Sequence, residues 1–470
     1  MRPNVLLVIL DAARRDALEP YGASPGSSPT VADLAKRGRA LPQVYATGSW
    51  TVPSHASIFT GLMPRAAGLS RVPSLNAPKP VLDAQRERVL PEVMRRAGYR
   101  TAAVSANLWV SEASGFDLGF EEFVQINSGR QAHFHGSGFR SRLGWLSETA
   151  RASIDDGARA AGDTFARWID APPDQPFFWF ANIIESHSPY LPPRPYGDVS
   201  LLERLRAGQD ALRYYTLPAI WRSCTGGYDV PDSTIERMRR LYRASIRYMD
   251  DWLGRLLERM DQARLLDDTL VIVASDHGEN FGEGGLLTHA LSLDNRLIHV
   301  PVVLAGPGSD GASITSLAEL PRLIADAAGL DRHPWHDDLP AGIGVAQFDP
   351  PAEPDDPKVR EAVTEWGLGD EAARKLTTPL TCAVQDELKL VENGDREEVY
   401  DLATDPLELA AMTPADTSPD RAGQLAALRA AVRHPAVTAE RSADAPAAAP
   451  DASPEELRDI EERMKLLGYM

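Results

Sequence analysis

The chain has 470 residues, 43% of them hydrophobic, so it can bury a large core and still support a smaller second unit. Its 49 basic and 67 acidic residues give a net charge of −18, which argues against a nucleic acid or an anionic membrane as its main partner. Its two cysteines cannot form a disulfide framework and no stretch approaches the roughly 18 apolar residues of a membrane span, so we expect a soluble cytoplasmic protein.

The first predicted element is a strand at residues 4–10, a continuous apolar run typical of a strand buried on both faces. Ligands collect at the carboxyl ends of strands in open α/β sheets, so Asp11 is a candidate metal ligand, with capping of the next helix as the alternative. Arg2 and the apolar run also resemble a secretion signal. Cleavage after the alanines at 12 and 13 would remove Asp11, however, so we expect a core strand here.

Residues 49–61 read Ser-Trp-Thr-Val-Pro-Ser-His-Ala-Ser-Ile-Phe-Thr-Gly. This segment resembles the Cys/Ser/Thr-x-Pro-Ser-Arg/His…Thr-Gly signature of the sulfatase-like branch of the alkaline phosphatase superfamily. The resemblance implies an α/β fold with a mainly parallel sheet flanked by helices and a smaller C-terminal α+β subdomain. It also implies that Thr51 is the nucleophile and a metal ligand. His55 would bind substrate, with a structural hydrogen bond as the alternative.

The residue at position 51 bears on which kind of ester the protein cleaves. Sulfatases proper carry a cysteine there that is oxidised to formylglycine, whereas the cysteines of this chain, Cys224 and Cys382, lie far from Thr51 in the sequence. The resemblance therefore implies a reaction at phosphorus rather than at sulfur.

Two further segments match the family between residues 100 and 190. Residues 105–109 match a segment that reaches the site in relatives, which makes Asn107 a candidate for substrate binding through an amide that could donate to an oxyanion. The apolar run beginning at residue 177 reads as another buried strand and leads to His187 in a His-Ser-Pro-Tyr sequence. The family's His-x-Pro-Tyr/Phe element binds the transferred group and protonates the leaving group, which makes His187 a catalytic candidate.

A helix predicted at residues 237–260 is followed by a strand at residues 270–276 and the sequence Asp-His-Gly-Glu. In the matching family motif the first two residues bind metal, which implies Asp276 and His277 as ligands alongside Asp11 and Thr51. Three oxygens and one nitrogen suit Mn²⁺ or Zn²⁺, with Ca²⁺ and Mg²⁺ as alternatives and a second ion left open. His289 matches a family histidine or lysine that contacts the transferred group, and is a second catalytic candidate.

The chain divides by composition and motif into a catalytic domain at residues 1–345, a subdomain at 346–436, a flexible linker at 437–454 and a helix at 455–470. We expect a core strand at 299–305 and short strands near 361–366 and 380–391. Residues 397–408 resemble the segment that closes the family's C-terminal subdomain. The sequence leaves open whether the final helix docks back or supports a homo-oligomer.

These observations predict a metal-dependent hydrolase or transferase that acts on a small anionic phosphate ester, phosphodiester or phosphonate ester, and no nucleic-acid partner. A divalent cation would make a threonine hydroxyl an effective nucleophile and neutralise charge on a phosphoryl oxygen. Two alternatives stay open: a sulfate-ester hydrolase without formylglycine, and an inactive binding protein with the same fold. The presence of all four ligand residues argues against the inactive protein.

Overall fold

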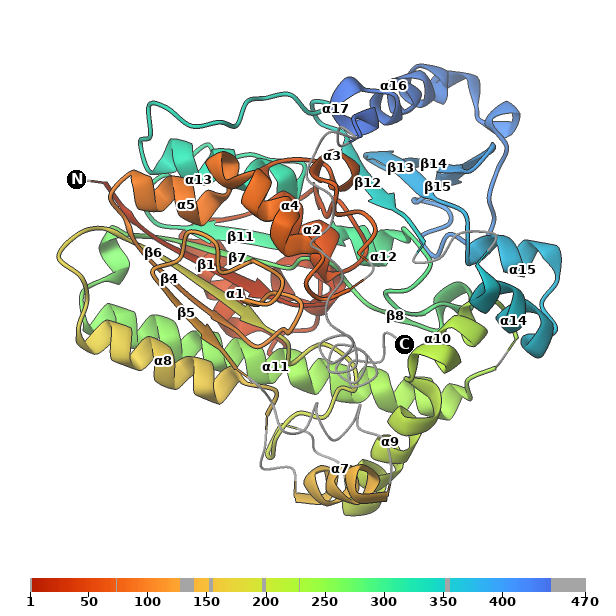
Figure 1. Cartoon of the computed structure of the whole chain (residues 1–470), viewed down its shortest axis with the longest axis horizontal. Coiled ribbons are helices and arrows are strands. Elements are labelled where there is room, and N and C mark those ends of the chain that lie inside the picture. Colours follow the sequence, from red (N-terminus) through yellow and green to blue (C-terminus); the bar gives the residue numbers. More distant parts are fainter. Residues whose placement is uncertain are drawn as a thin grey trace.

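The computed structural model describes residues 2–72, 74–126, 139–151, 155–196, 200–227, 229–350 and 356–440, and its centre is a twisted sheet (Figure 1). Within these ranges the sheet has seven strands in the order β2-β11-β7-β1-β6-β4-β5. The strands are β1 (Asn4–Leu10), β2 (Arg39–Ala40), β4 (Arg100–Ser105), β5 (Glu122–Gln125), β6 (Phe177–Ile183), β7 (Thr269–Ala274) and β11 (Val302–Ala305).

Strand β1 is central and runs parallel to both of its neighbours. Its Leu7 pairs with Phe180 of β6 on one side and with Ile272 of β7 on the other. Strands β4 and β5 extend the parallel sheet. The opposite edge is closed by β11, which is antiparallel to β7, and by β2, which is antiparallel to β11. The expected strand at residues 299–305 is divided at Pro301 into β10 (His299–Val300), which pairs with β3 (Val44–Tyr45), and β11. The mainly parallel α/β sheet expected from the sequence is confirmed.

Alternate side chains of β1 enter cores on opposite faces of the sheet. Leu6 and Val8 face the core formed with α1 (Pro29–Arg37), α8 (Ala158–Asp170) and the long helix α11 (Asp232–Gln262). Leu7 and Ile9 face the core formed with α2 (Thr51–Thr60), α5 (Leu90–Arg96) and α13 (Leu320–Ala327), as the helix layers of Figure 1 show. A side chain of this kind contributes about 1.5–3 kcal/mol when fully buried, which explains why the run at 4–10 is apolar on both faces.

Shorter elements connect these layers. The remaining α-helices in the described part of the first 350 residues are α3 (Pro64–Ala67), α4 (Pro78–Ala84), α7 (Phe139–Arg151), α9 (Leu201–Tyr214), α10 (Leu217–Cys224) and α12 (Asn295–Ile298). A two-stranded hairpin, β8 (Asn280–Phe281) with β9 (Leu287–Thr288), follows the central strand β7. No helix within the described ranges is long and apolar enough to cross a membrane.

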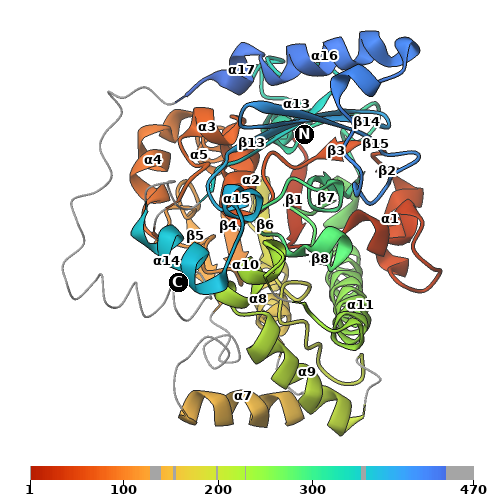
Figure 2. The same ribbon diagram turned by 90° about the vertical axis from the view of Figure 1, so that its right-hand side faces the viewer.

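A second sheet forms the C-terminal subdomain, and helix α16 packs on it (Figure 2). The described part of this antiparallel sheet has the order β12-β13-β14-β15. Its elements are β12 (Gly344–Phe348), β13 (Leu380–Gln385), β14 (Leu388–Asn393) and β15 (Arg396–Asp401), with α14 (Pro357–Trp366), α15 (Asp370–Lys375), α16 (Ala422–Val432) and α17 (Pro435–Thr438). The predicted helix at 455–470 and most of the predicted linker lie outside the described residues.

The strand expected near residues 361–366 is wrong, because this segment belongs to helix α14. Val359 is buried and Val363 packs against the same core four residues later. That spacing places both side chains on one helical face, and this tertiary contact outweighs the β preference of valine.

Candidate active site

Four neighbouring strands bring polar residues to one edge of the sheet. Asp11 follows β1 directly, Asn182 is the penultimate residue of β6, Asn107 lies two residues beyond β4, and Asp276 lies two residues beyond β7. Because these strands are adjacent in the order β7-β1-β6-β4 and parallel, their carboxyl ends meet. This edge is where open α/β sheets place their ligands.

Thr51 is the first residue of helix α2, and the hydroxyl lies against this edge. Thr51 Oγ1 is 3.5 Å from His277 Nε2 and accepts a hydrogen bond from Asn107 Nδ2 at 3.3 Å. Its side chain is completely buried. The N-terminus of a helix favours negative charge, so developing charge on this oxygen or on a bound anion is stabilised here.

Asp11, Asp276 and His277 are arranged to hold a cation. One ligand atom from each lies within 4.8 Å of the others, and no other such group occurs in the described part of the chain. Asp11 Oδ1 and Asp276 Oδ2 are buried and have no hydrogen-bond partner among the described residues. Since buried carboxylate oxygens without partners are costly, this donor set fits a divalent metal.

The remaining atoms of the three residues are held by the protein. Asn107 Nδ2 donates to Asp11 Oδ2 at 2.7 Å, and the backbone amide of His277 donates to Asp276 Oδ1 at 2.9 Å. His277 Nδ1 lies 2.9 Å from the carbonyl oxygen of Gly278, to which it donates, so Nε2 carries the free lone pair that metal binding requires.

Burial also controls the titration of the three residues of the cluster. Burial raises the pKa of Asp276 to about 7. Burial and the neighbouring Asp276 carboxylate raise the pKa of Asp11, while burial lowers the pKa of His277 to about 3. Burial therefore favours the neutral forms of all three side chains.

Stabilisation by metal should therefore grow with pH. The raised pKa means that folded metal-free protein keeps on Asp276 a proton that the unfolded chain releases near its ordinary value of 3.8. Metal-free protein consequently loses stability as the pH rises from about 4 through about 7. We expect the increase in melting temperature on adding Mn²⁺ or Zn²⁺ to be at least about 2 °C larger at pH 8 than at pH 5. Calorimetry of matched metal-free and metal-loaded samples measures this, and an equal or smaller increase at pH 8 would contradict it.

His55 lies beneath the cluster with both ring nitrogens engaged. Its Nδ1 donates to the carbonyl oxygen of Thr51 at 3.0 Å, and Asn182 Nδ2 donates to its Nε2 at 2.9 Å. The ring is completely buried, which lowers its pKa to about 4. This geometry favours the structural hydrogen bond over direct substrate binding, because the described residues already occupy both nitrogens.

His187 and His289 lie beside the cluster and are partly accessible. Their ring centroids are 5.1 Å apart, and the His289 ring is 4.4 Å from that of His277. His187 Nδ1 donates to the carbonyl oxygen of Ser188 at 3.0 Å. Burial and the nearby His187 lower the pKa of His289 well below its ordinary value. The structure thus brings together every site residue inferred from the sequence.

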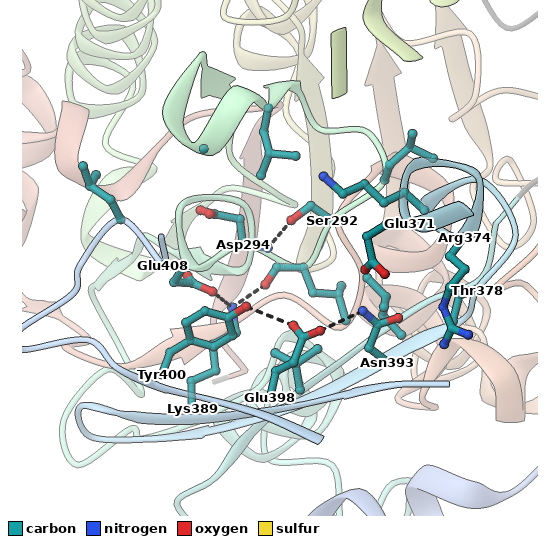
Figure 3. A pocket seen from close by; sticks show the side chains of 18 residues that line it. Ser292, Asp294, Glu371, Arg374, Thr378, Lys389, Asn393, Glu398, Tyr400 and Glu408 are labelled. Carbon is teal, nitrogen blue, oxygen red and sulfur yellow. Dashed lines mark hydrogen bonds and ion pairs between the residues drawn. The ribbon is translucent and has the colours of Figure 1, made fainter. Parts of the chain in front are cut away.

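The C-terminal subdomain holds the segment that follows His289. A cavity of about 230 Å³ lies between residues 284–294 and the C-terminal sheet (Figure 3). The fully buried Lys389 donates to the carbonyl oxygen of Leu293 at 2.6 Å and pairs with Glu408. Glu408 also accepts from the backbone amide of Asn295 at 2.6 Å. These contacts hold residues 293–295 against the C-terminal subdomain.

Sequence reasoning missed two polar residues of the site. Asn182 donates to both Asp11 and His55, and Glu279 lies 3.1 Å from His289. Asn182 could have been noticed as the polar residue near the carboxyl end of an otherwise apolar strand. Glu279 stood within the Asp-His-Gly-Glu motif without an assigned role.

Comparison with known proteins gives consistent relationships. The family model described as sulfatase matches residues 3–330. A choline-sulfatase of Rhizobium meliloti (strain 1021) is 26% identical over 465 residues, covering 91% of this chain and 86% of that protein. The phosphonate monoester hydrolase structure of Agrobacterium radiobacter superposes with a TM-score of 0.62 at 19% identity, covering 96% and 100% of the two chains. The 2-O GAG sulfatase BT1596 gives a TM-score of 0.62 at 15% identity, covering 92% and 91%. At these identities the structural matches show the fold alone.

Proposed function

Because the chain belongs to the sulfatase family, we propose that it is a metal-dependent hydrolase that cleaves a phosphate ester, phosphodiester or phosphonate ester with Thr51 as its nucleophile. The observation that supports this proposal is the buried Thr51 hydroxyl at the start of α2, 3.5 Å from His277 Nε2. Position 51 is a threonine and offers no thiol for conversion to formylglycine. The two cysteines lie elsewhere, Cys382 in β13 and Cys224 against the backbone of Leu287.

The metal would be held by Asp11, Thr51, Asp276 and His277, and we favour Mn²⁺ or Zn²⁺ because the donors are oxygen and imidazole nitrogen. A bound divalent ion supplies Lewis acidity, which lowers the pKa of the hydroxyl and neutralises charge on the ester. Asn107 Nδ2 lies between Thr51 Oγ1 and Asp11, where it can also donate to an oxygen of the substrate.

In the proposed reaction the Thr51 hydroxyl releases its proton to water, Oγ1 forms a bond to phosphorus, and the bond from phosphorus to the alcohol oxygen breaks. The departing oxygen takes the bonding electron pair and needs a proton unless it is already a stable anion. His187 and His289 are the accessible imidazoles beside the cluster, so we assign leaving-group protonation and contact with the transferred group to them. Attack of water on phosphothreonine then completes hydrolysis. An alcohol in place of water would give transfer.

A substrate panel tests the proposal. Purified protein, with and without Mn²⁺ and Zn²⁺, would be assayed on aryl phosphate monoesters, diesters, phosphonate esters and sulfate esters. We expect kcat/KM for a phosphodiester or phosphonate ester to exceed that for the matched sulfate at least about tenfold. Threonine lacks the second hydroxyl of a formylglycine hydrate, so a sulfated intermediate cannot be released by collapse to the aldehyde.

The second candidate is hydrolysis of sulfate esters without formylglycine. It is favoured by the relatives themselves, among which are a choline-sulfatase and an iduronate 2-sulfatase. A clear preference for sulfate esters in the same panel would replace the phosphorus assignment with this one.

A further inference from the structure

The hairpin of β8 and β9 places a carboxylate opposite an active-site histidine. Asn280 pairs with Thr288 in its antiparallel register, so the next residues outward are Glu279 and His289. Their side chains meet at 3.1 Å, from Glu279 Oε1 to His289 Nδ1. The contact joins the segment that carries the metal ligand His277 to the segment that carries His289.

The contact selects one form of the imidazole ring. The Glu279 side chain has no solvent exposure and that of His289 only 11%, so water competes weakly for this hydrogen bond. When Glu279 is ionised its carboxylate can only accept, and His289 Nδ1 then carries the proton and donates it. His289 Nε2 has no hydrogen-bond partner among the described residues and is the ring nitrogen left for a ligand.

The backbone around His289 is also held in an unusual conformation. Thr288 has φ of 53° and Leu291 has φ of 55°, in the left-handed region that residues other than glycine rarely adopt. Such conformations persist where surrounding contacts impose them, and they cluster at functional sites. A ring carried by this backbone needs a side-chain contact to fix its own rotation, and Glu279 provides that contact.

We propose that Glu279 is a positioning residue that keeps a proton on His289 Nδ1 and orients the ring so that Nε2 faces the ester group, where a proton taken up from solvent on Nε2 can pass to the departing oxygen. The proposal deepens the proposed function, since it relies on an ester bound beside His289. It does not depend on whether the reacting atom is phosphorus or sulfur.

The first test compares two substitutions of Glu279. Glu279→Ala removes the acceptor and should lower kcat about 10–100-fold with little change in KM, the usual size of an effect transmitted through a neighbouring group. Glu279→Gln keeps an oxygen that can accept from Nδ1 and should recover most of the lost kcat. Metal content should stay at the wild-type value in both variants.

A double-mutant cycle with His289→Ala shows whether Glu279 acts through this histidine. If it does, Glu279→Ala combined with His289→Ala should be no slower than His289→Ala alone. If the double variant instead shows the product of the two single-variant losses in kcat, the proposal is overturned. Glu92→Ala removes a buried carboxylate from α5, which contacts Arg95 and Arg96 away from the site, and serves as the matched control with wild-type kcat.

Nitrogen NMR of histidine-labelled protein gives a readout that needs no activity. The signal missing from His289→Ala identifies His289, and it should show a protonated Nδ1 in wild-type protein and lose that pattern in Glu279→Ala. A wild-type His289 protonated only at Nε2 would refute the proposal. Absence of turnover on every ester would instead count against the proposed function, while the NMR result would still decide the role of Glu279.

Discussion

Thr51→Ala is expected to lower kcat by at least about a thousandfold on every ester that the wild-type protein cleaves. The substitution removes the only protein atom that forms a bond to phosphorus in the proposed mechanism. It deletes a hydroxyl and a methyl group at the start of a helix and leaves the backbone of α2 unchanged, so the protein should stay folded. Initial rates on the best substrate of the panel, with the circular dichroism spectrum as a check of folding, measure the effect.

Thr51→Ser is the matched control, because it keeps a hydroxyl at position 51 and should retain measurable turnover. Mass spectrometry of protein quenched during turnover should show one added phosphoryl or phosphonyl group in wild-type protein and none in Thr51→Ala. Wild-type turnover by Thr51→Ala would exclude the covalent mechanism altogether.

Asp276→Asn is expected to abolish metal binding and, as a result, to lower kcat by at least about a thousandfold. Wild-type protein should contain about one transition metal ion per chain by elemental analysis. The amide that replaces Asp276 keeps an oxygen for the backbone amides of Ala12 and His277, but it lacks the negative charge that balances the cation. The variant no longer buries a carboxylate that lacks a partner. Without metal it should therefore be at least as stable as metal-free wild-type protein.

Asp250→Asn tests whether loss of any buried carboxylate has the same effect. Asp250 lies in α11 and accepts hydrogen bonds from the backbone amides of Thr30 and Val31 at the start of α1. This variant should lose some stability but keep its metal and its kcat. Full metal content in Asp276→Asn would show that the ligand assignment is wrong.

The sequence predicted the fold class, which the structure confirms, and it supplied the proposed ligands through the motifs that carry the family resemblance. The apolar runs at residues 4–10 and 270–276 are long enough and apolar enough to indicate strands buried on both faces. Asp11 and Asp276 come where these runs end, and Thr51 lies in a motif whose spacing is local. Such signals survive in one sequence because a strand and the loop after it are set by neighbouring residues.

The tertiary structure alone decided which of these residues touch. Strand order places Asn182 beside Asp11 and His55, and nothing in the sequence shows that β6 is the neighbour of β1. In the same way, the hairpin register brings Glu279 to His289, ten positions further along the chain. The engagement of both His55 nitrogens and the helical state of residues 357–366 also depend on partners distant in sequence. These features follow from long-range packing. Its free energy is shared among many contacts, so no single segment of the sequence predicts it.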